Sequence, residues 1–455
     1  MRLLILLPLL SHLLTQCFAL SDYFWFISDI HFDPTYGSAS ESCREDADLM
    51  KLGEFGSVDC DAPWRLAESA IHGMHLNGGG AQFIVWAGDS VPHTREDTLS
   101  EEKVLTGIQK LTDQLRLEFP RTPVYPLLGN HDYHPRNQLP GKTNNIYESL
   151  ATMWQDWLNE GGRNPEVLET FRKGGYYTKI MVELDEKIRA LVLNTNLYYL
   201  ANEATDGIDD PGEQFAWMEE VLQGATQEDE KVHVFVHIPP GTDFRSQQNS
   251  RFNRLIVKYA DVILGIYAGH HHFDSFRIYY DEQNAEPVAG MFISPSVSPL
   301  KGYLDDSIPH NPAIRKYIFD RYKFTLQDYE QFYLLLDLAN SQNNTAWQIL
   351  YSFSKTYGVK NVDPANLVIV KDGFKEFANE DFHKYYERKY VNLRRGYVPC
   401  DCDCKEQEIC AIGNLNRTQY DACVVEADCS GLNGAGTLNA ASLGAVLVAA
   451  VFIFH

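Results

Sequence analysis

The sequence predicts an α/β protein in which a β-sandwich is flanked by helices and followed by a smaller, disulfide-pinned C-terminal domain. Six short runs rich in β-branched and aromatic residues each end in a polar cluster, and a stretch with helical periodicity separates two of them. Cysteines crowd the end of the chain. We expect the larger domain to cover residues 20–320 and the helical, Cys-rich domain to cover residues 321–429.

The six runs are typical of buried strands whose C-terminal ends carry loops into one cleft. They read YFWFISDIHFD, QFIVWAGDSVPH, VYPLLGNHDYHP, IRALVLNTN, KVHVFVHIPPG and VILGIYAGHHH. A crossover helix, and hence parallel strands, is predicted between the second and third runs by the helical spacing of Leu99, Val104, Ile108, Leu111 and Leu115. Two later runs, DSFRIYY and PVAGMFISPSVSP, are expected to finish the sandwich.

The composition limits the classes of partner. With 455 residues, the chain has room for one large α/β domain and a smaller satellite, or for two to three ordinary domains. Its 39 Lys and Arg residues against 62 Asp and Glu residues give a formal charge of -23. Such a field repels phosphate backbones, which argues against a nucleic-acid polymer as the partner.

The N-terminus indicates export. Residues 1–19 combine an early Arg with a short apolar core, and Cys17 and Ala19 lie where small residues precede a signal-peptidase cut. The alternative is a membrane anchor, but the apolar core is shorter than the ~20 residues of a membrane span. Asn-x-Thr sequons at Asn343 and Asn416 suit the same compartment and predict a glycoprotein.

The C-terminus has the pattern of a glycolipid-anchor signal. Small residues around Asn433 are followed by a polar spacer and the apolar tail LGAVLVAAVFIFH. We expect residues 430–455 to be removed, with attachment at Asn433 or Ser430. A C-terminal membrane helix is the alternative, although such a helix is usually longer and followed by Lys or Arg.

The cysteines of an exported chain indicate disulfides. Without Cys17, eight remain, and six of them lie between residues 400 and 429. Cys43 and Cys60, isolated together, are expected to bridge each other. A thiolate zinc knuckle in PCDCDCKEQEIC is the alternative, which the export signals disfavour.

Polar side chains suited to metal binding or proton transfer follow the apolar runs directly. They are Asp29, His31, Asp89, Asn130, His131, His237, His270 and His272. Each alone is typical of a turn, but five strand ends together indicate a site. In the i, i+2 pairs, extended backbone would direct both side chains to one side. The middle residue His271 would then face elsewhere, and we expect it to pack or hydrogen-bond.

Nitrogen and oxygen ligands without thiolate suit zinc, manganese or iron, and a His-rich extracellular site favours zinc. Two ions about 3.5–4 Å apart need a bridging carboxylate, for which Asp89 is the best candidate. Such a pair would recruit a phosphate and activate a water. His131 is the candidate general acid, and Asp132 either orients it or is exposed. His93 either contacts phosphate or donates a proton, unless it is only a turn residue after Pro92.

Five motifs in order carry a resemblance to a known family. They are D-x-H from Asp29, G-D-x-x-P-H from Gly88, G-N-H-D from Gly129, H-x-P-P-G from His237 and G-H-x-H from Gly269. This set resembles the calcineurin-like metallophosphoesterases. Within them, residues 22–429 look like the acid sphingomyelinase branch, and most like its 3a- and 3b-type phosphodiesterases.

The resemblance implies roles for single residues. One zinc would be held by Asp29, His31 and His272, the other by Asn130, His237 and His270, with Asp89 shared. His131 and His93 match the family's leaving-group and phosphate histidines. The resemblance also implies disulfides between Cys400 and Cys404 and between Cys410 and Cys423, and it leaves the pairing of Cys402 and Cys429 open.

Departures from related classes narrow the assignment. Acid sphingomyelinase carries a saposin domain before its catalytic part, whereas the first metal motif here begins soon after the expected signal peptide, so lipid extraction by a built-in saposin is not expected. The anchor signal favours the 3b-like, glycolipid-tethered form. Pro92 stands where purple acid phosphatases expect a tyrosine ligand, which argues against that class.

We therefore expect an extracellular zinc phosphodiesterase, tethered or secreted and monomeric. Its substrates would be nucleotides, CDP-choline-like compounds or phospholipid head groups such as that of sphingomyelin. The alternative is a membrane-tethered protein that modulates lipids or receptors, with minor activity. All seven expected ligands are present, which favours the enzyme, and replacing Asp89 with alanine separates the two hypotheses.

Overall fold

The computed structural model of the chain describes residues 21–37, 41–159, 164–283, 285–301, 308–375, 380–391 and 400–426. The expected signal peptide and the expected anchor signal, with Ser430 and Asn433, lie outside the described residues, as does Cys429. Among the described residues, no helix has the length and apolarity needed to cross a membrane.

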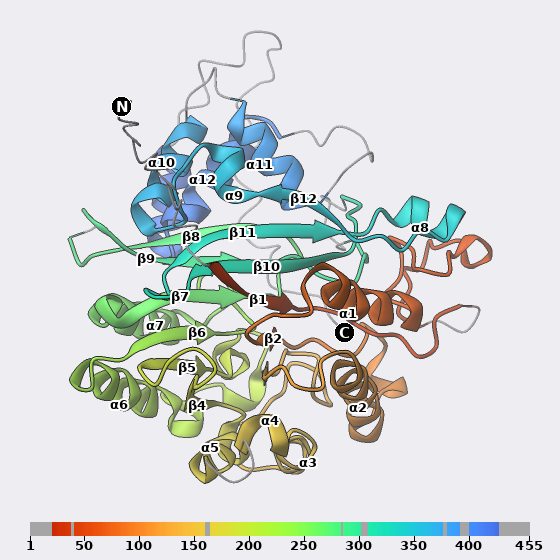
Figure 1. Cartoon of the computed structure of the whole chain (residues 1–455), viewed down its shortest axis with the longest axis horizontal. Coiled ribbons are helices and arrows are strands. Elements are labelled where there is room, and N and C mark those ends of the chain that lie inside the picture. The colour runs from red at the N-terminus through yellow and green to blue at the C-terminus, as the bar shows by residue number, and fades with distance from the viewer. Residues whose placement is uncertain are drawn as a thin grey trace, which may run out of the picture.

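Twelve strands of the described chain form two six-stranded sheets (Figure 1). The first has the order β12-β11-β10-β1-β2-β3 and the second the order β4-β5-β6-β7-β9-β8. The strands are β1 Ser21–Ile27, β2 Ile84–Trp86, β3 Val124–Pro126, β4 Tyr177–Ile180, β5 Ile188–Val192, β6 Lys231–Phe235, β7 Ile263–Ala268, β8 Ser275–Tyr280, β9 Pro287–Ile293, β10 Ala313–Asp320, β11 Leu326–Tyr333 and β12 Gln348–Ser352.

Helices lie around these sheets. In Figure 1, α6 and α7 lie on one side of the strands, α1 and α2 on the other, and α10 to α12 at the end near β8 and β9. The helices are α1 Trp64–Gly78, α2 Glu101–Glu118, α3 Asn145–Met153, α4 Gln155–Asn159, α5 Pro165–Gly174, α6 Gln214–Gln227, α7 Ser246–Lys258, α8 Leu336–Gln342, α9 Phe353–Tyr357, α10 Pro364–Lys375, α11 Asp381–Lys389, α12 Cys402–Gly413 and α13 Arg417–Glu426. The predicted β-sandwich flanked by helices is confirmed.

An aromatic core joins the two sheets. Phe24 of β1 lies with its ring centroid 5.3 Å from that of Tyr267 on β7 and 6.2 Å from that of Phe235 on β6. All three side chains are buried. Edge-to-face aromatic pairs at such distances stabilise a core beyond the area that they bury. The packing of these rings sets how the ends of β1 and of β6 and β7 face each other.

The predicted crossover helix is α2, and β2 and β3 are parallel as expected. The Oγ of Ser100 accepts a hydrogen bond from the backbone N–H of Lys103 and caps the helix. The predicted apolar positions at 104, 108, 111 and 115 are buried. β1 also pairs parallel with β2, so the C-terminal ends of β1, β2 and β3 meet at one edge.

Three disulfides tie the described chain together, and they confirm the expected pairs. Cys43 bonds to Cys60, Cys400 to Cys404, and Cys410 to Cys423. Disulfides favour a secretory route for the chain. Cys402 is also disulfide-bonded, and the pairing of Cys402 and Cys429 stays open because Cys429 lies outside the described residues.

The expected domain boundary falls at the end of β10. β11 and β12 continue the same sheet beyond residue 320, since β10 pairs antiparallel with β11 and β11 with β12. The helices α10 to α13 then follow. The division at residues 320 and 321 stays a prediction, and the strands on its two sides pair directly.

A buried ion pair joins β10 to the segment before β8. Arg315 is fully buried, and its Nη2 lies 2.7 Å from Oδ1 of Asp274. The hydroxyl groups of Tyr329 and Tyr351 also donate to this carboxylate. Burying two charges is costly, but each of these groups has several partners. The pair fixes the histidine-rich segment that ends at residue 272 against the first sheet.

We predict that Arg315→Met lowers the free energy of unfolding by about 3–5 kcal/mol, because it leaves the carboxylate of Asp274 buried without its cation. The double variant Arg315→Met/Asp274→Leu recovers part of this loss. Chemical denaturation measures both effects. Arg321→Met, which removes an exposed pair with Asp22, is the control and changes stability little. Equal, small effects of Arg315→Met and Arg321→Met would contradict the account.

Candidate metal centre

The predicted site residues come from the C-terminal ends of five strands. Asp29 and His31 follow β1, Asp89 follows β2, Asn130 and His131 follow β3, His237 follows β6, and His270 and His272 follow β7. β1, β2 and β3 are neighbours in one sheet, and β6 and β7 are neighbours in the other. The site therefore lies where the strand ends of the two sheets meet.

The backbone at these residues is left-handed, not extended as expected. Asp29, His31, Asp89, His270 and His272 have φ values of 53°, 45°, 53°, 70° and 63°. Residues other than glycine seldom adopt this conformation, which costs of order 1–3 kcal/mol each and concentrates at functional sites. Asp29 and His31 do converge in one group of potential ligands, whereas His270 and His272 enter two different groups that share Asp89.

Glycines allow the strand-end loops to approach closely. A Cβ atom on Gly129 would lie 2.1 Å from Oδ1 of Asp89, and one on Gly269 would lie 2.6 Å from Oδ2 of Asp29. Only hydrogen fits in these spaces. The glycines of the G-N-H-D and G-H-x-H motifs are thus required because carboxylates of other loops pack against their α-carbons.

The first group of potential ligands comprises Asp29, His31, Asp89 and His272, whose ligand atoms lie within 4.8 Å of one another. Nε2 of His31 lies 3.0 Å from Nε2 of His272 and 3.5 Å from Oδ2 of Asp89. Nε2 of His272 lies 3.5 Å from Oδ1 of Asp29. Two carboxylates and two imidazoles therefore share one small volume.

The second group comprises Asp89, His237 and His270, again within 4.8 Å. Nε2 of His237 lies 3.3 Å from Oδ2 of Asp89 and 3.1 Å from Oδ1 of Asn130. The amide of Asn130 is oriented by a hydrogen bond from its Nδ2 to Oδ1 of Asn137. Asp89 belongs to both groups, so its carboxylate lies between them.

The imidazoles fit a divalent cation. Nδ1 of His31 donates to the carbonyl oxygen of Val91 at 2.9 Å, and Nδ1 of His237 donates to that of Ala87 at 2.7 Å. These bonds leave Nε2 of both rings for a ligand bond, which is the arrangement of metal-binding histidines. The donor set of nitrogen and oxygen atoms is the set that zinc, manganese and iron accept.

Burial and the charges of neighbouring side chains determine the pKa values of the site residues. Burial lowers the pKa of His31 and His270, that of His270 to about 3. Burial opposes the charged form of His237 too, but Asp89 and Asp29 outweigh it and raise its pKa to about 9. Burial raises the pKa of Asp89, but the charge of the His237 ring outweighs burial and holds this pKa well below its usual value. The site thus holds ionised carboxylates that need a cation.

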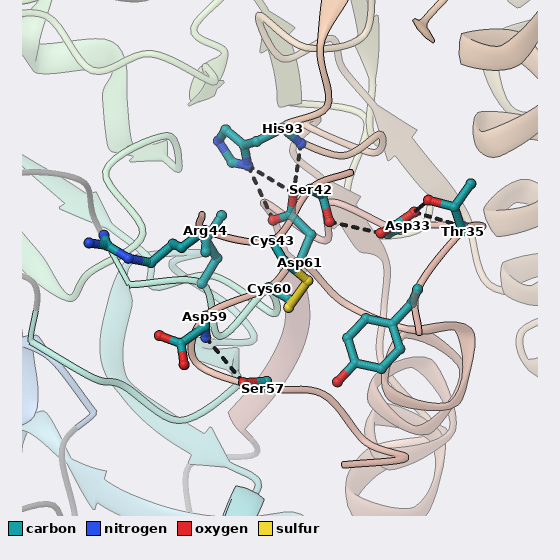
Figure 2. The surroundings of a disulfide bond; sticks show 12 residues. Asp33, Thr35, Ser42, Cys43, Arg44, Ser57, Asp59, Cys60, Asp61 and His93 are labelled. Carbon is teal, nitrogen blue, oxygen red and sulfur yellow. Dashed lines mark hydrogen bonds and ion pairs between the residues drawn. A yellow bond between two sulfur atoms is a disulfide. The ribbon is translucent and has the colours of Figure 1, made fainter. Parts of the chain in front are cut away.

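A third group, His31, His93 and His131, adjoins the first. The ring centroids of His93 and His131 lie 4.3 Å apart. Asp61 is fully buried and holds His93 twice, accepting its backbone N–H at 2.6 Å and its Nδ1–H at 3.1 Å (Figure 2). Asp61 also accepts a bond from Ser298 and follows the disulfide residue Cys60 directly.

Asp132 neither orients His131 nor is exposed, and both expectations for it are wrong. Its carboxylate is buried and accepts three backbone N–H groups, those of Asp89, Ser90 and Gly129, at 2.8–2.9 Å. It therefore shapes the loop that carries Asp89. His271 hydrogen-bonds as expected, since its Nε2 lies 2.6 Å from Oδ2 of Asp243.

Family models match both parts of the chain. Residues 23–274 match the calcineurin-like phosphoesterase model, which covers more than half of the sequence. Residues 286–429 match the model of the acid sphingomyelin phosphodiesterase C-terminal region. The second match begins at β9, so it includes both the last strands of the sheets and the Cys-rich helices.

Curated relatives match over most of their length. The chain is 36% identical to the human (Homo sapiens) cyclic GMP-AMP phosphodiesterase SMPDL3A over 414 residues, which cover 88% of this chain and 89% of the relative. It is 35% identical to human acid sphingomyelinase-like phosphodiesterase 3b, covering 88% and 90%. It is 30% identical to sphingomyelinase phosphodiesterase C of Dictyostelium discoideum, covering 89% and 92%.

The family matches agree with the resemblance to the calcineurin-like metallophosphoesterases that the five motifs indicate. The cluster of imidazoles and carboxylates agrees with it as well. The site is a candidate site for a divalent metal, and the substrates are small phosphoesters. The chain belongs to the acid sphingomyelinase-like phosphodiesterases of the calcineurin-like phosphoesterase family, and it is a hydrolase of phosphodiester bonds.

Proposed function

We propose that the chain is a zinc-dependent phosphodiesterase that uses two metal ions to hydrolyse nucleotide-like phosphodiester and phosphoanhydride bonds. The observation that carries this proposal is the pair of ligand groups that share Asp89, with His93 and His131 beside them. Asp29, His31 and His272 would hold one ion, and Asn130, His237 and His270 the other. The donor distances of both groups support this division.

The chain's own residues transfer the proton and contact the phosphoryl group. When bound, divalent ions supply Lewis acidity towards the phosphoryl group and a water-derived nucleophile at neutral pH. His131, which flanks the first group, donates a proton to the leaving oxygen. His93 contacts a phosphoryl oxygen through the imidazole edge that Asp61 does not hold. Burial lowers the pKa of His131, so its protonated form gives up a proton more readily than an exposed imidazolium group does.

Nucleotides are the substrate class that we favour. The name of one relative specifies cyclic GMP-AMP, and the names of others specify sphingomyelin. Buried carboxylates and histidines at the centre form a compact polar site, which suits a charged, water-soluble phosphoester. Sphingomyelin and CDP-choline remain the alternatives within the same chemistry.

A screen of the purified chain tests this function. It compares turnover of nucleoside triphosphates, a cyclic dinucleotide, CDP-choline and sphingomyelin, with elemental analysis of the same sample. We expect nucleotide substrates to be turned over faster than sphingomyelin, and about two zinc ions per chain. A metal-loaded sample that prefers sphingomyelin, or that hydrolyses none of the four, overturns the proposal.

We further propose that the chain works in the secretory pathway, tethered to the outer face of the plasma membrane by a glycolipid or released from it. The disulfides and the sequence of residues 430–455 support this setting. Treatment of expressing cells with phosphatidylinositol-specific phospholipase tests the tether. Release of activity into the medium supports the anchor, and retention on the cells argues for another attachment.

We predict that Asp89→Asn lowers kcat/KM at least about a thousandfold, which corresponds to about 4 kcal/mol of lost transition-state stabilisation. The variant also retains less metal, because one ligand of each group is weakened. Steady-state kinetics and elemental analysis measure the two effects. Asp113→Asn, on the exposed face of α2, is the control and changes neither. A fully active Asp89→Asn variant would show that metal ions at this site do not drive turnover.

We predict that Asp61→Asn lowers kcat/KM about 10- to 100-fold, because Asp61 orients His93. In a His93→Ala background the same change costs less than about twofold, since its effect passes through His93. A double-mutant cycle measures this coupling. The control is Asp59→Asn on the same loop, which pairs with Lys301 instead. Additive losses in the cycle would contradict a positioning role.

A further inference from the structure

We propose that a cavity beside the metal centre binds the part of the substrate that carries a second anionic group. This inference rests on the proposed function, because it assigns a second binding surface to the same phosphodiester substrates. The cavity has a volume of about 330 Å³. One wall is the loop at Gly241 to Asp243 with His271 and Arg277, and the other wall is formed by α12 and α13.

The cavity lies next to the second ligand group. The ring centroid of His271 is 5.7 Å from that of His270. The loop that carries Asp243 continues into Phe244, which forms an isolated β-bridge with Tyr199. The ring of Tyr199 in turn lies 5.3 Å from that of His270. A substrate whose phosphate is held at the centre therefore reaches the cavity with its next group.

Both walls are held in place by one buried side chain. Oδ1 of Asn249 on α7 accepts the backbone N–H of Gly241 at 2.9 Å, and its Nδ2 donates to the carbonyl oxygen of Leu415 at 2.6 Å. The Cys410–Cys423 disulfide joins α12 to α13. The cavity is thus preformed, and preformed cavities with a few fixed polar groups are typical of ligand sites.

Arg277 offers unused donors to this cavity. Its Nη1 donates to Oγ of Ser275 and to the carbonyl oxygen of Phe276. Within the described part of the chain, no carboxylate lies within ion-pair distance of its guanidinium group. A guanidinium group carries five N–H donors, and its remaining donors suit the oxygens of a phosphate. Arg417 adds a second cation at the same cavity.

His271 lines the cavity beside Asp243. Its Nε2 donates to Oδ2 of Asp243 at 2.6 Å, because a carboxylate only accepts. Its Nδ1 is buried and has no hydrogen-bond partner among the described residues. The ion pair with Asp243 fixes the orientation of this ring in the cavity wall. The ring of Tyr420 adds a flat surface.

These features select among the substrate classes. Arg277 favours a second phosphate over the cationic choline group of sphingomyelin or CDP-choline, because Arg417 is paired with Asp421 and the carboxylate of Asp243 is held by His271. The aromatic ring of Tyr420 in the cavity lining suits a base. The cavity therefore fits the distal nucleotide unit of a dinucleotide, while the scissile phosphate lies at the metal centre.

The test compares kcat/KM for a cyclic dinucleotide, which has two phosphates, with kcat/KM for bis(p-nitrophenyl) phosphate, which has one. Arg277→Gln is expected to lower the ratio of the two values about tenfold, mainly through KM for the dinucleotide. Arg417→Gln lowers it less, about threefold, since Arg417 is exposed and pairs with Asp421. Arg321→Gln, an exposed residue elsewhere, is the control and keeps the ratio.

Melting curves show whether each variant is folded. If Arg277→Gln misfolds, Arg417→Gln still tests the inference, because Arg417 is exposed and its replacement leaves the fold intact. If the wild-type chain turns over both substrates and both variants keep the wild-type ratio, the inference about the cavity is overturned while the proposed function stands. Equal losses for both substrates overturn it as well, because they place the arginines outside substrate selection. A wild-type chain that turns over neither substrate overturns the proposed function and the inference with it.

Discussion

The buried carboxylate of Asp89 is the feature on which the rest of the site depends. Its Oδ2 lies 3.5 Å from Nε2 of His31 and 3.3 Å from Nε2 of His237, which belong to different sheets, and its Oδ1 accepts the backbone N–H of His131. An ionised carboxylate buried this deeply requires compensating positive charge. Imidazoles and divalent cations supply such charge, so the surroundings of Asp89 form a candidate site for a divalent metal.

The two sheets each supply half of this site, and the packing between them sets its geometry. β1 to β3 carry the aspartates, the asparagine and the first histidines, whereas β6 and β7 carry the remaining histidines. The aromatic rings between Phe24 and Tyr267 and the buried pair of Arg315 with Asp274 hold the sheets together close to these strand ends. The region that matches the acid sphingomyelin phosphodiesterase C-terminal model thus stabilises the catalytic half, because it contributes Arg315.

Much of this arrangement was predictable, and the failures have a common cause. Local patterns predicted the strands that carry the site and the helix α2, because apolar periodicity and turn residues act over a few positions. The isolation of Cys43 and Cys60 predicted their disulfide, whereas the family resemblance implied the two disulfides near the C-terminus. The side chains that hold the site in place were missed. Asp61 contacts His93 from 32 residues away, and Asp132 reaches the backbone of Asp89 across 43 residues. Spacing along the chain carries no signal for such contacts, although the position of Asp61 beside a disulfide cysteine was a usable hint. The left-handed backbone at the strand ends was also beyond reach, since only the packing of neighbouring loops requires it.

In the proposed function, two cations lie on either side of the carboxylate at position 89. The most direct measurement is anomalous X-ray scattering at the zinc edge from crystals of the purified chain. We expect two peaks about 3.5–4 Å apart, one nearest to the side chains of His31 and His272 and the other nearest to those of His237 and His270. A single peak away from Asp89, or no anomalous signal from catalytically active crystals, would contradict the proposed function.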